Sequence, residues 1–200
     1  MELIFATSNK GKLKEAQEIL GDGYSLSTPS DYGITEDIPE TGATLADNSF
    51  QKAEYIVRRL RDCLDVVCFA DDTGLEVDAL GGAPGIYTAR YAGPGHDFDA
   101  NIDKLLSELD KCPEGTPRTA RFRCVVTLVT PQQTIQFEGL LEGRIALRRS
   151  GSGGFGYDPV FIADDYPDRT LSEISEEAKN AISHRGKALR EMTLWIKQNL

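Results

Sequence analysis

The chain has 200 residues, 40% of them hydrophobic, which is enough for one domain with a sizeable core. Its 22 Lys and Arg against 32 Asp and Glu give a formal net charge of -10, and so acidic a surface argues against extended polynucleotide binding. No apolar run approaches the ~20 residues of a membrane span, and the N-terminus lacks a signal-peptide pattern. We therefore expect a cytoplasmic protein without a nucleic-acid or membrane partner, folded as a single domain over residues 1–200.

The first predicted element is a short buried strand, Leu3 to Ala6, and an amphipathic helix is predicted over residues 12–20, ending at Gly21. Between them lies a polar segment with two lysines, consisting of Thr7, Ser8, Asn9, Lys10, Gly11 and Lys12. The first backbone N–H groups of a helix are free and lie at the positive end of its dipole. We therefore expect this segment to bind an anion such as a phosphate.

A second helix is predicted over residues 45–60, after an acidic turn, and a buried strand follows from Val66 to Ala70. That strand leads directly into Asp71, Asp72, Thr73 and Gly74. Because consecutive strand residues point to opposite faces, the two aspartates should have different roles. One of them, with Glu40 from the acidic turn, could bind Mg²⁺ or accept a proton from an attacking water. A turn with Asx-type caps explains these four residues equally well.

The rest of the chain mixes helices and strands without strict alternation. A third helix is predicted around residues 102–109, and a last one over residues 187–199. Alternating hydrophobicity predicts two long strands over residues 121–130 and 134–147, and a short strand ends near Ile162. This pattern predicts an α/β fold in which helices flank a mixed twisted sheet.

Two later segments carry residues suited to a planar, polar ligand. Glycines on both sides of Phe155 would let the backbone approach a flat ligand while the ring stacks on it, although a hairpin corner with a buried Phe explains the segment equally well. Ser183 is suited to cap the last helix. Next to it, His184 and Arg185 could face a pocket, where the arginine fork would suit carbonyl or phosphate oxygens.

Several familiar motifs do not occur in the sequence. It contains no P-loop, no GxGxxG, no GxSxG and no HExxH, so metal-assisted attack of water fits its residues better than a Ser-His-Asp triad. The four cysteines form no CxxC pair, and only two histidines could assist them in binding zinc. We expect reduced structural thiols at Cys63, Cys68, Cys112 and Cys124.

In this order and spacing, the clusters resemble the inosine and xanthosine triphosphate pyrophosphatases, which hydrolyse non-canonical purine nucleoside triphosphates. The resemblance runs nearly end to end. The matching segments are Thr7–Lys12, Glu40–Gly42, Asn48 with Lys52 and Ala53, Ala70–Leu75, Gly81–Gly85, Ala89–Tyr91, Gly153–Pro159, Lys179–Asn180 and Ser183–Gly186. Thr73 stands where serine is common in that family, which keeps the hydroxyl group.

The resemblance implies an elongated sheet in two lobes around a central cleft, a homodimer and a Mg²⁺ cofactor. It implies that Thr7 to Lys12 grip the triphosphate of a small-molecule substrate, that Glu40 and Asp72 hold the metal, and that Asp72 also accepts a proton. The remaining substrate contacts that it implies are Thr73, Phe155, Gly156, Tyr157, Asp158, Lys179, His184 and Arg185. Of these, Phe155 to Asp158 would enclose the base, and the last three would read its edge.

The implied reaction is attack of water on the α-phosphorus, which yields a nucleoside monophosphate and pyrophosphate. Three other functions remain open at this point. A related pyrophosphatase could act on modified pyrimidine or 7-methylguanine triphosphates, a nucleotide sensor would bind without hydrolysis, and a kinase would transfer phosphate to a second substrate. The assay of pyrophosphate release across a panel of triphosphates separates them.

Overall fold

The structure is a computed structural model that describes residues 1–60 and 66–200, so that Cys63 lies outside the described residues. The chain divides into two compact units. Unit 1 comprises Met1–Asp72, Cys124–Gly139 and His184–Leu200, and unit 2 comprises Thr73–Arg123 and Leu140–Ser183. No helix in the described ranges combines the length and the hydropathy of a membrane span. Cys68, Cys112 and Cys124 are thiols that form no disulfide among the described residues.

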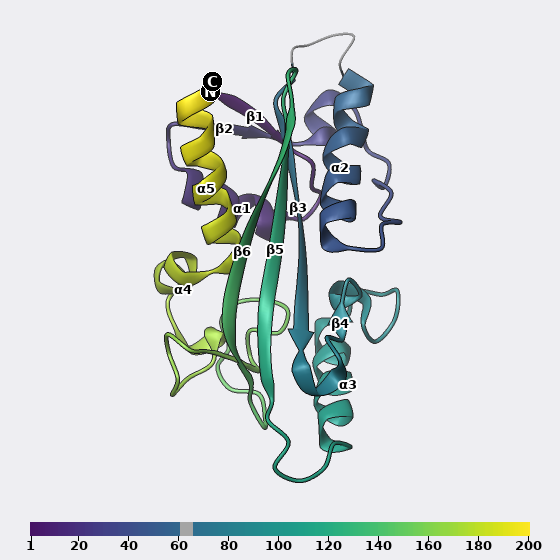
Figure 1. Cartoon of the computed structure of the whole chain (residues 1–200), viewed down its shortest axis with the longest axis vertical. Coiled ribbons are helices and arrows are strands. Elements are labelled where there is room, and N and C mark those ends of the chain that lie inside the picture. The colour runs from purple at the N-terminus through teal and green to yellow at the C-terminus, as the bar shows by residue number, and fades with distance from the viewer. Residues whose placement is uncertain (61–65) are drawn as a thin grey trace. The chain divides into compact units, whose positions relative to one another are not determined.

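The strands form a mixed sheet in the order β2-β1-β3-β5-β6-β7, with β4 paired to β3 (Figure 1). The strands are β1 (Glu2–Phe5), β2 (Ser25–Ser27), β3 (Cys68–Val77), β4 (Pro84–Gly85), β5 (Thr119–Val129), β6 (Thr134–Ile145) and β7 (Phe161–Ala163). β1 pairs in parallel with β2 and β3, whereas β4 is antiparallel to β3 and β7 is antiparallel to β6. The predicted mixed α/β class is therefore confirmed.

The helices agree closely with the apolar spacing of the sequence. They are α1 (Lys10–Leu20), α2 (Leu45–Leu60), α3 (Phe98–Asp110), α4 (Glu176–Ile182) and α5 (His184–Asn199), with short 3₁₀ helices at Pro29–Tyr32, Asp78–Leu80, Thr88–Arg90 and Leu171–Glu173. α2 has the predicted bounds. α5 begins three residues earlier than predicted, so that His184 and Arg185 lie in its first turn rather than before it.

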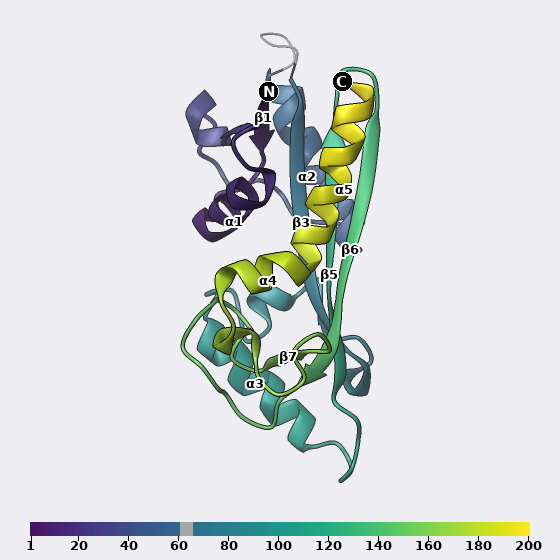
Figure 2. The same ribbon diagram turned by 90° about the vertical axis from the view of Figure 1, so that its left-hand side faces the viewer.

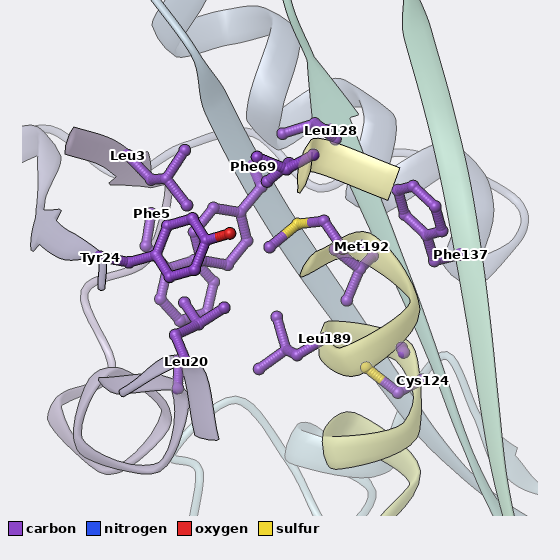
Figure 3. Close-up of a cluster of buried hydrophobic side chains, with 14 residues drawn as sticks. Leu3, Phe5, Leu20, Tyr24, Phe69, Cys124, Leu128, Phe137, Leu189 and Met192 are labelled. Carbon is purple, nitrogen blue, oxygen red and sulfur yellow. The ribbon is translucent and has the colours of Figure 1, made fainter. Parts of the chain in front are cut away.

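Unit 1 has a hydrophobic cluster on each face of its strands, and α2 lies across these strands from α5 (Figure 1). Leu3 and Phe5 of β1 pack with Leu20 of α1 and with Leu189 of α5 (Figure 3). The rings of Phe5 and Phe69, from neighbouring strands, stack with their centroids 4.4 Å apart. On the opposite face, β1 and β3 pack against the apolar side of α2 through Ile4, Ala6, Cys68, Ala70, Ala53, Ile56 and Leu60.

Unit 2 has its own core, which contains α3 and β7 (Figure 2). Leu75 and Val77 of β3 belong to this cluster, together with Leu105 of α3. The ring of Phe161 in β7 lies against Phe122 of β5, with 4.6 Å between the centroids. This packing holds the C-terminal half of β3 in an extended conformation.

The structure corrects the predicted end of the strand after Ala70. β3 continues to Val77, so Asp71 to Gly74 lie within a strand, and their interpretation as an Asx-capped turn was wrong. The backbone continues to pair, because Leu75 and Glu76 lie opposite Gly85 and Pro84 of β4. Polar residues need not end a strand when their side chains find partners.

Candidate active site

The segment Thr7 to Lys12 is organised by Asn9, which caps α1. Its Oδ1 accepts hydrogen bonds from the backbone N–H groups of Gly11, at 2.9 Å, and Lys12, at 3.1 Å. The Asn9 N–H itself donates to Oγ1 of Thr7 at 3.1 Å. Two of the N–H groups that were expected to be free for an anion therefore already have an acceptor. The cationic groups of the segment are its two lysines, of which Lys10 is exposed.

The consecutive residues Asp71 and Asp72 point to opposite faces of β3, as the alternation of a strand requires. Asp71 follows the register of Phe69 and faces α1 and α5, where it bonds to Lys12 and Arg185. Asp72 follows the register of Ala70 and faces α2. The prediction that the two aspartates have different roles gains geometric support from these separate surroundings.

Asp71 is buried among cations, with 1% of its side chain exposed. Its Oδ1 lies 3.0 Å from Nζ of Lys12, and its Oδ2 lies 3.0 Å from Nε of Arg185. Burial on its own would raise the pKa of Asp71, but Lys12, Arg185 and Lys52 outweigh it and hold that pKa well below its usual range. Asp71 is therefore a permanent anion that fixes two cations, rather than a group that exchanges protons.

Asp72 lies in a more balanced environment. Its Oδ2 accepts from the amide of Asn48 at 3.1 Å, and its Oδ1 lies 3.2 Å from Nζ of Lys52. Burial raises the pKa of Asp72 above its ordinary value, although Lys52 and Lys12 act in the opposite direction. A carboxylate with a raised pKa is a better proton acceptor than an ordinary aspartate.

Glu40 and Asp72 converge on one cation. Nζ of Lys52 lies 2.8 Å from Oε1 of Glu40 and 3.2 Å from Oδ1 of Asp72. Burial would lower the pKa of Lys52, but Asp72, Asp71 and Glu40 outweigh it and the pKa is raised, so the ammonium stays charged. Two carboxylates that share one ammonium mark a position at which positive charge is favoured.

The turn that carries Glu40 is fastened to α2. The N–H of Thr41 donates to Oε1 of Gln51 at 2.8 Å, and the N–H of Gly42 donates to Oδ1 of Asn48 at 2.8 Å. Asn48 therefore connects this turn to Asp72, because its Nδ2 bonds to the aspartate. The acidic turn and β3 are therefore linked through two side chains of α2, Asn48 and Lys52.

Glu40 and Asp72 suit a Mg²⁺ ion that takes most of its coordinating oxygens from a bound phosphate group and from water. No cluster of three or more metal-ligating side chains occurs in residues 1–60 and 66–200. Mg²⁺ at a nucleotide site is commonly bound by one or two carboxylates, because phosphate oxygens and waters complete its shell. Glu40 and Asp72 supply that number of carboxylates, and their shared partner Lys52 shows that both reach one cation.

The predicted base-binding loop belongs to unit 2 and is organised by Asp158. Its Oδ2 accepts from the N–H of Phe155 at 2.8 Å and from Nζ of Lys179 at 2.5 Å. The same ammonium lies 4.5 Å from the centroid of the Phe155 ring. Gly154 has a φ of 75°, and a Cβ there would lie 2.2 Å from Oδ2 of Asp158, so only glycine suits this turn.

Phe155 is the exposed aromatic ring of this loop, with 39% of its surface accessible, whereas Tyr157 is buried. The hydroxyl of Tyr157 donates to the carbonyl oxygen of Thr88 at 2.9 Å. The alternative of a hairpin corner with a buried Phe is therefore wrong. An exposed ring with an ammonium group beside it can stack on a flat ligand. The buried Tyr157 anchors the loop through its hydrogen bond to Thr88.

Arg185 and His184 begin α5 and are both buried. The guanidinium of Arg185 bonds through Nε to Asp71 and through Nη1 to Oε2 of Glu15. α5 comes this close to the sheet because residue 139 in β6 is glycine: a Cβ on Gly139 would lie 2.0 Å from the carbonyl oxygen of His184. A role for Arg185 in reading a base stays a prediction, since two of its nitrogens already have carboxylate partners.

Lys52 and Glu15 have a part in this arrangement and were not assigned roles from the sequence. Lys52 lies four residues after Asn48 on the buried face of α2, and Glu15 lies on the buried face of α1. A polar or charged residue in an otherwise apolar helix stripe is a signal that could have found both, because burial of a charge requires a partner.

Comparison with known proteins identifies relatives over nearly the whole chain. A family model described as the Ham1 family matches residues 3–195. The chain is 47% identical to the dITP/XTP pyrophosphatase of Halalkalibacterium halodurans, over 98% of each protein. It is 46% identical to the dITP/XTP pyrophosphatase of Bacillus subtilis, over 96% of this chain and 95% of that protein. The solved structure of the Staphylococcus aureus Ham1 protein is 37% identical and covers 100% of both chains with a TM-score of 0.87.

Proposed function

The chain belongs to the Ham1 family, and from that premise we propose that it hydrolyses non-canonical purine nucleoside triphosphates to the monophosphate and pyrophosphate. The proposed substrates are dITP, XTP and ITP. Two relatives of nearly the same length carry the name dITP/XTP pyrophosphatase, which supports the first two. We further propose that the enzyme is cytoplasmic, acts as a homodimer and forms a single functional domain over residues 1–200.

The observation that carries the proposal is the convergence of Glu40 and Asp72 on one ammonium group, that of Lys52. In the proposed enzyme, both carboxylates hold Mg²⁺ when the triphosphate is bound. The ion supplies positive charge that lowers the repulsion between the triphosphate and an attacking oxygen. Lys52 keeps the two carboxylates together.

Asp72 is the proposed proton acceptor. Water attacks the α-phosphorus, its proton passes to a carboxylate oxygen of Asp72, and the bond from the α-phosphorus to the bridging oxygen breaks, so that pyrophosphate leaves. Before metal binds, burial raises the pKa of Asp72, and a stronger base accepts a proton more readily. Asn48 donates to Oδ2 of Asp72 and so restricts its rotation.

Lys12 is proposed to neutralise charge on the departing pyrophosphate. Its ammonium is held by Asp71 at 3.0 Å, and 18% of its side chain is exposed. A cation that is already fixed near the position of developing charge lowers the barrier without reorganisation during the reaction. In the same proposal, the hydroxyl groups of Thr7 and Ser8, the side-chain NH₂ of Asn9 and the ammonium of Lys10 complete the contacts with the triphosphate, and Gly11 leaves room for its close approach.

Selection of the base is proposed to rest on stacking against Phe155 and on hydrogen-bond donors from other side chains. The ring would stack on the purine, while Gly156, Tyr157 and Asp158 keep the loop in shape, and Thr73 would contact the substrate. Hypoxanthine and xanthine present an oxygen at position 6, which Lys179, His184 or Arg185 can meet with N–H donors. Adenine has an amino group there and would leave the donors unmatched, a difference that can discriminate by ~10⁴-fold.

The proposal is tested by following both products with the purified protein and Mg²⁺. With dITP or XTP, we expect one pyrophosphate per monophosphate formed and no transfer of phosphate to an added acceptor. A nucleotide sensor would bind these triphosphates without releasing pyrophosphate, and a kinase would form a phosphorylated acceptor. Faster release from dUTP or a 7-methylguanosine triphosphate than from dITP would assign the protein to a different class of pyrophosphatase.

A further inference from the structure

A buried row of ion pairs connects Glu15 to Lys12 within unit 1. Oε2 of Glu15 pairs with Nη1 of Arg185, and Nε of Arg185 lies 3.0 Å from Oδ2 of Asp71. The other oxygen of Asp71, Oδ1, lies 3.0 Å from Nζ of Lys12. The row thus begins and ends on α1, and it passes through α5 and β3.

The row balances its charges and is closed to solvent along most of its length. Two carboxylates and two cations alternate along it, and their exposed fractions are 9% for Glu15, 2% for Arg185 and 1% for Asp71. Exposure rises to 18% only at Lys12. Buried charges are tolerated when each has a partner of opposite sign, so a change at one end alters the balance along the whole row.

Glu15 lies one helical turn after Lys12 on α1, and its carboxylate pairs with Arg185. We propose that Glu15 is a positioning residue for the hydrolysis of the triphosphate: it holds Arg185, which shares Asp71 with Lys12, and so it fixes the ammonium of Lys12. This inference rests on the proposed function, because it needs Lys12 to meet the leaving pyrophosphate.

Removal of the Glu15 charge should act on Lys12 through Asp71. Without the charge of Glu15, the Arg185 guanidinium would be drawn more strongly toward both oxygens of Asp71, because arginine and carboxylate groups prefer two parallel hydrogen bonds. Oδ1 of Asp71 would then be shared between Arg185 and Lys12. The ammonium of Lys12 would lose its fixed direction, and a displacement of 1 Å at a reacting centre can cost about 100-fold in rate.

The change to test is Glu15→Gln, which keeps the size of the side chain and removes its charge. Glu18→Gln is the matched control, because Glu18 lies on the same helix and forms an exposed i,i+4 pair with Lys14, at 3.6 Å. Glu15→Asp keeps the charge and serves as the conservative variant. Circular dichroism and a thermal melt establish for each variant that the protein is folded at the assay temperature.

The first measurement is kcat and KM for dITP and for XTP, by release of pyrophosphate. We expect Glu15→Gln to lower kcat by about 10- to 100-fold with a much smaller change in KM, since in this proposal the effect reaches the substrate through Lys12 and the leaving pyrophosphate. The loss should be equal for the two substrates, because they share the triphosphate. Glu18→Gln should retain the original kcat, and Glu15→Asp should recover part of the loss. An unchanged kcat in Glu15→Gln, or a changed ratio of dITP to XTP, overturns the proposal.

The second measurement places Glu15→Gln in a Lys12→Arg background. If Glu15 acts through Lys12, the second substitution should cost far less there than in the unaltered protein, because coupled residues are not additive. A purely structural role predicts the same fractional loss in both backgrounds, and that result overturns the proposal. Where Glu15→Gln does not fold, Glu15→Asp takes its place in the same cycle.

Failure of the proposed function would be seen separately. If the unaltered protein and Glu18→Gln release no pyrophosphate from dITP or XTP, the hydrolysis itself is wrong, and the role of Glu15 falls with it. If both are active and Glu15→Gln is equally active, only the positioning role is overturned.

Discussion

Asp71 and Asp72 are adjacent in β3, yet each is bonded to a different lysine: Asp71 to Lys12 at 3.0 Å and Asp72 to Lys52 at 3.2 Å. The alternation of the strand places the two carboxylates on opposite faces, so the charged groups around them differ. Burial would raise the pKa of both, but the neighbouring charges change that result for only one of them. The pKa of Asp71 is lowered because Lys12 and Arg185 outweigh its burial, whereas burial raises the pKa of Asp72. One carboxylate is suited to hold cations and the other to exchange a proton.

Replacement of Asp72 by Asn should stop the reaction and leave binding largely intact. The amide cannot accept the proton of water, and loss of a general base typically costs about 10²- to 10⁴-fold in kcat. Pyrophosphate release measures the rate, and titration with a non-hydrolysable triphosphate analogue measures binding. An Asp72→Asn enzyme with near-normal kcat would remove Asp72 from the chemical step.

Replacement of Glu40 by Gln should raise the Mg²⁺ concentration needed for half-maximal activity. A neutral amide is a weaker ligand for a hard cation than a carboxylate. Glu36→Gln is the control, because Glu36 lies in the same acidic turn but pairs with Arg59. Activity measured against Mg²⁺ should shift for Glu40→Gln alone, and chelation of divalent ions should stop the unaltered enzyme. Equal shifts in both variants would argue against a metal at Glu40.

Replacement of Phe155 by Ala should weaken substrate binding more than it slows the chemical step. Stacking of a base on an aromatic ring contributes about 1–3 kcal/mol, so KM should rise by roughly tenfold or more. Phe98→Ala tests whether any exposed ring of unit 2 has this effect, because Phe98 is also exposed. If KM for dITP is the same in both variants, the base does not stack on Phe155.

The stability of the protein should depend on Asp71 at low pH. Its pKa is lower in the folded protein than the ordinary value near 4, so the unfolded chain binds more protons below that pH. This contribution is therefore present above about pH 5 and is lost as the pH falls toward 2. Asp71→Asn should lower the melting temperature at pH 7, because it leaves Arg185 and Lys12 with one carboxylate fewer.

Melting temperatures of both proteins between pH 7 and pH 3 test this effect. The difference between the unaltered protein and Asp71→Asn should narrow as the solution is acidified. Asp110→Asn, which alters an exposed pair with Arg118, should leave the profile unchanged. A difference that stays constant down to pH 3 would contradict the lowered pKa.

The fold could be read from the sequence where the spacing of apolar residues is regular. α2 has its predicted bounds because its apolar face repeats at helical intervals over four turns. β3 was predicted too short, because Asp71 to Gly74 are typical turn residues when read locally. What keeps them extended is not local: Asp71 is bonded to Arg185, 114 residues further along the chain.

In the site, too, the residue types could be predicted from the sequence, but the contacts between distant residues could not. The residue types at Glu40 and Asp72 indicate a cation, and that much follows from composition and position. The partners of these residues do not, because a single sequence carries no record of which distant side chains meet. Asn9 is a further example, since it was predicted only as part of an anion-binding segment, whereas in the structure its side chain caps α1 and accepts from two N–H groups.

The central claim is that water attacks the α-phosphorus of the triphosphate, and hydrolysis in ¹⁸O-labelled water tests it most directly. Unaltered enzyme, Mg²⁺ and dITP are incubated in labelled water, and mass spectrometry locates the label in the two products. Attack at the α-phosphorus predicts that the label enters the monophosphate and that the pyrophosphate carries none. Label in the pyrophosphate would place the attack at the β-phosphorus and contradict the account.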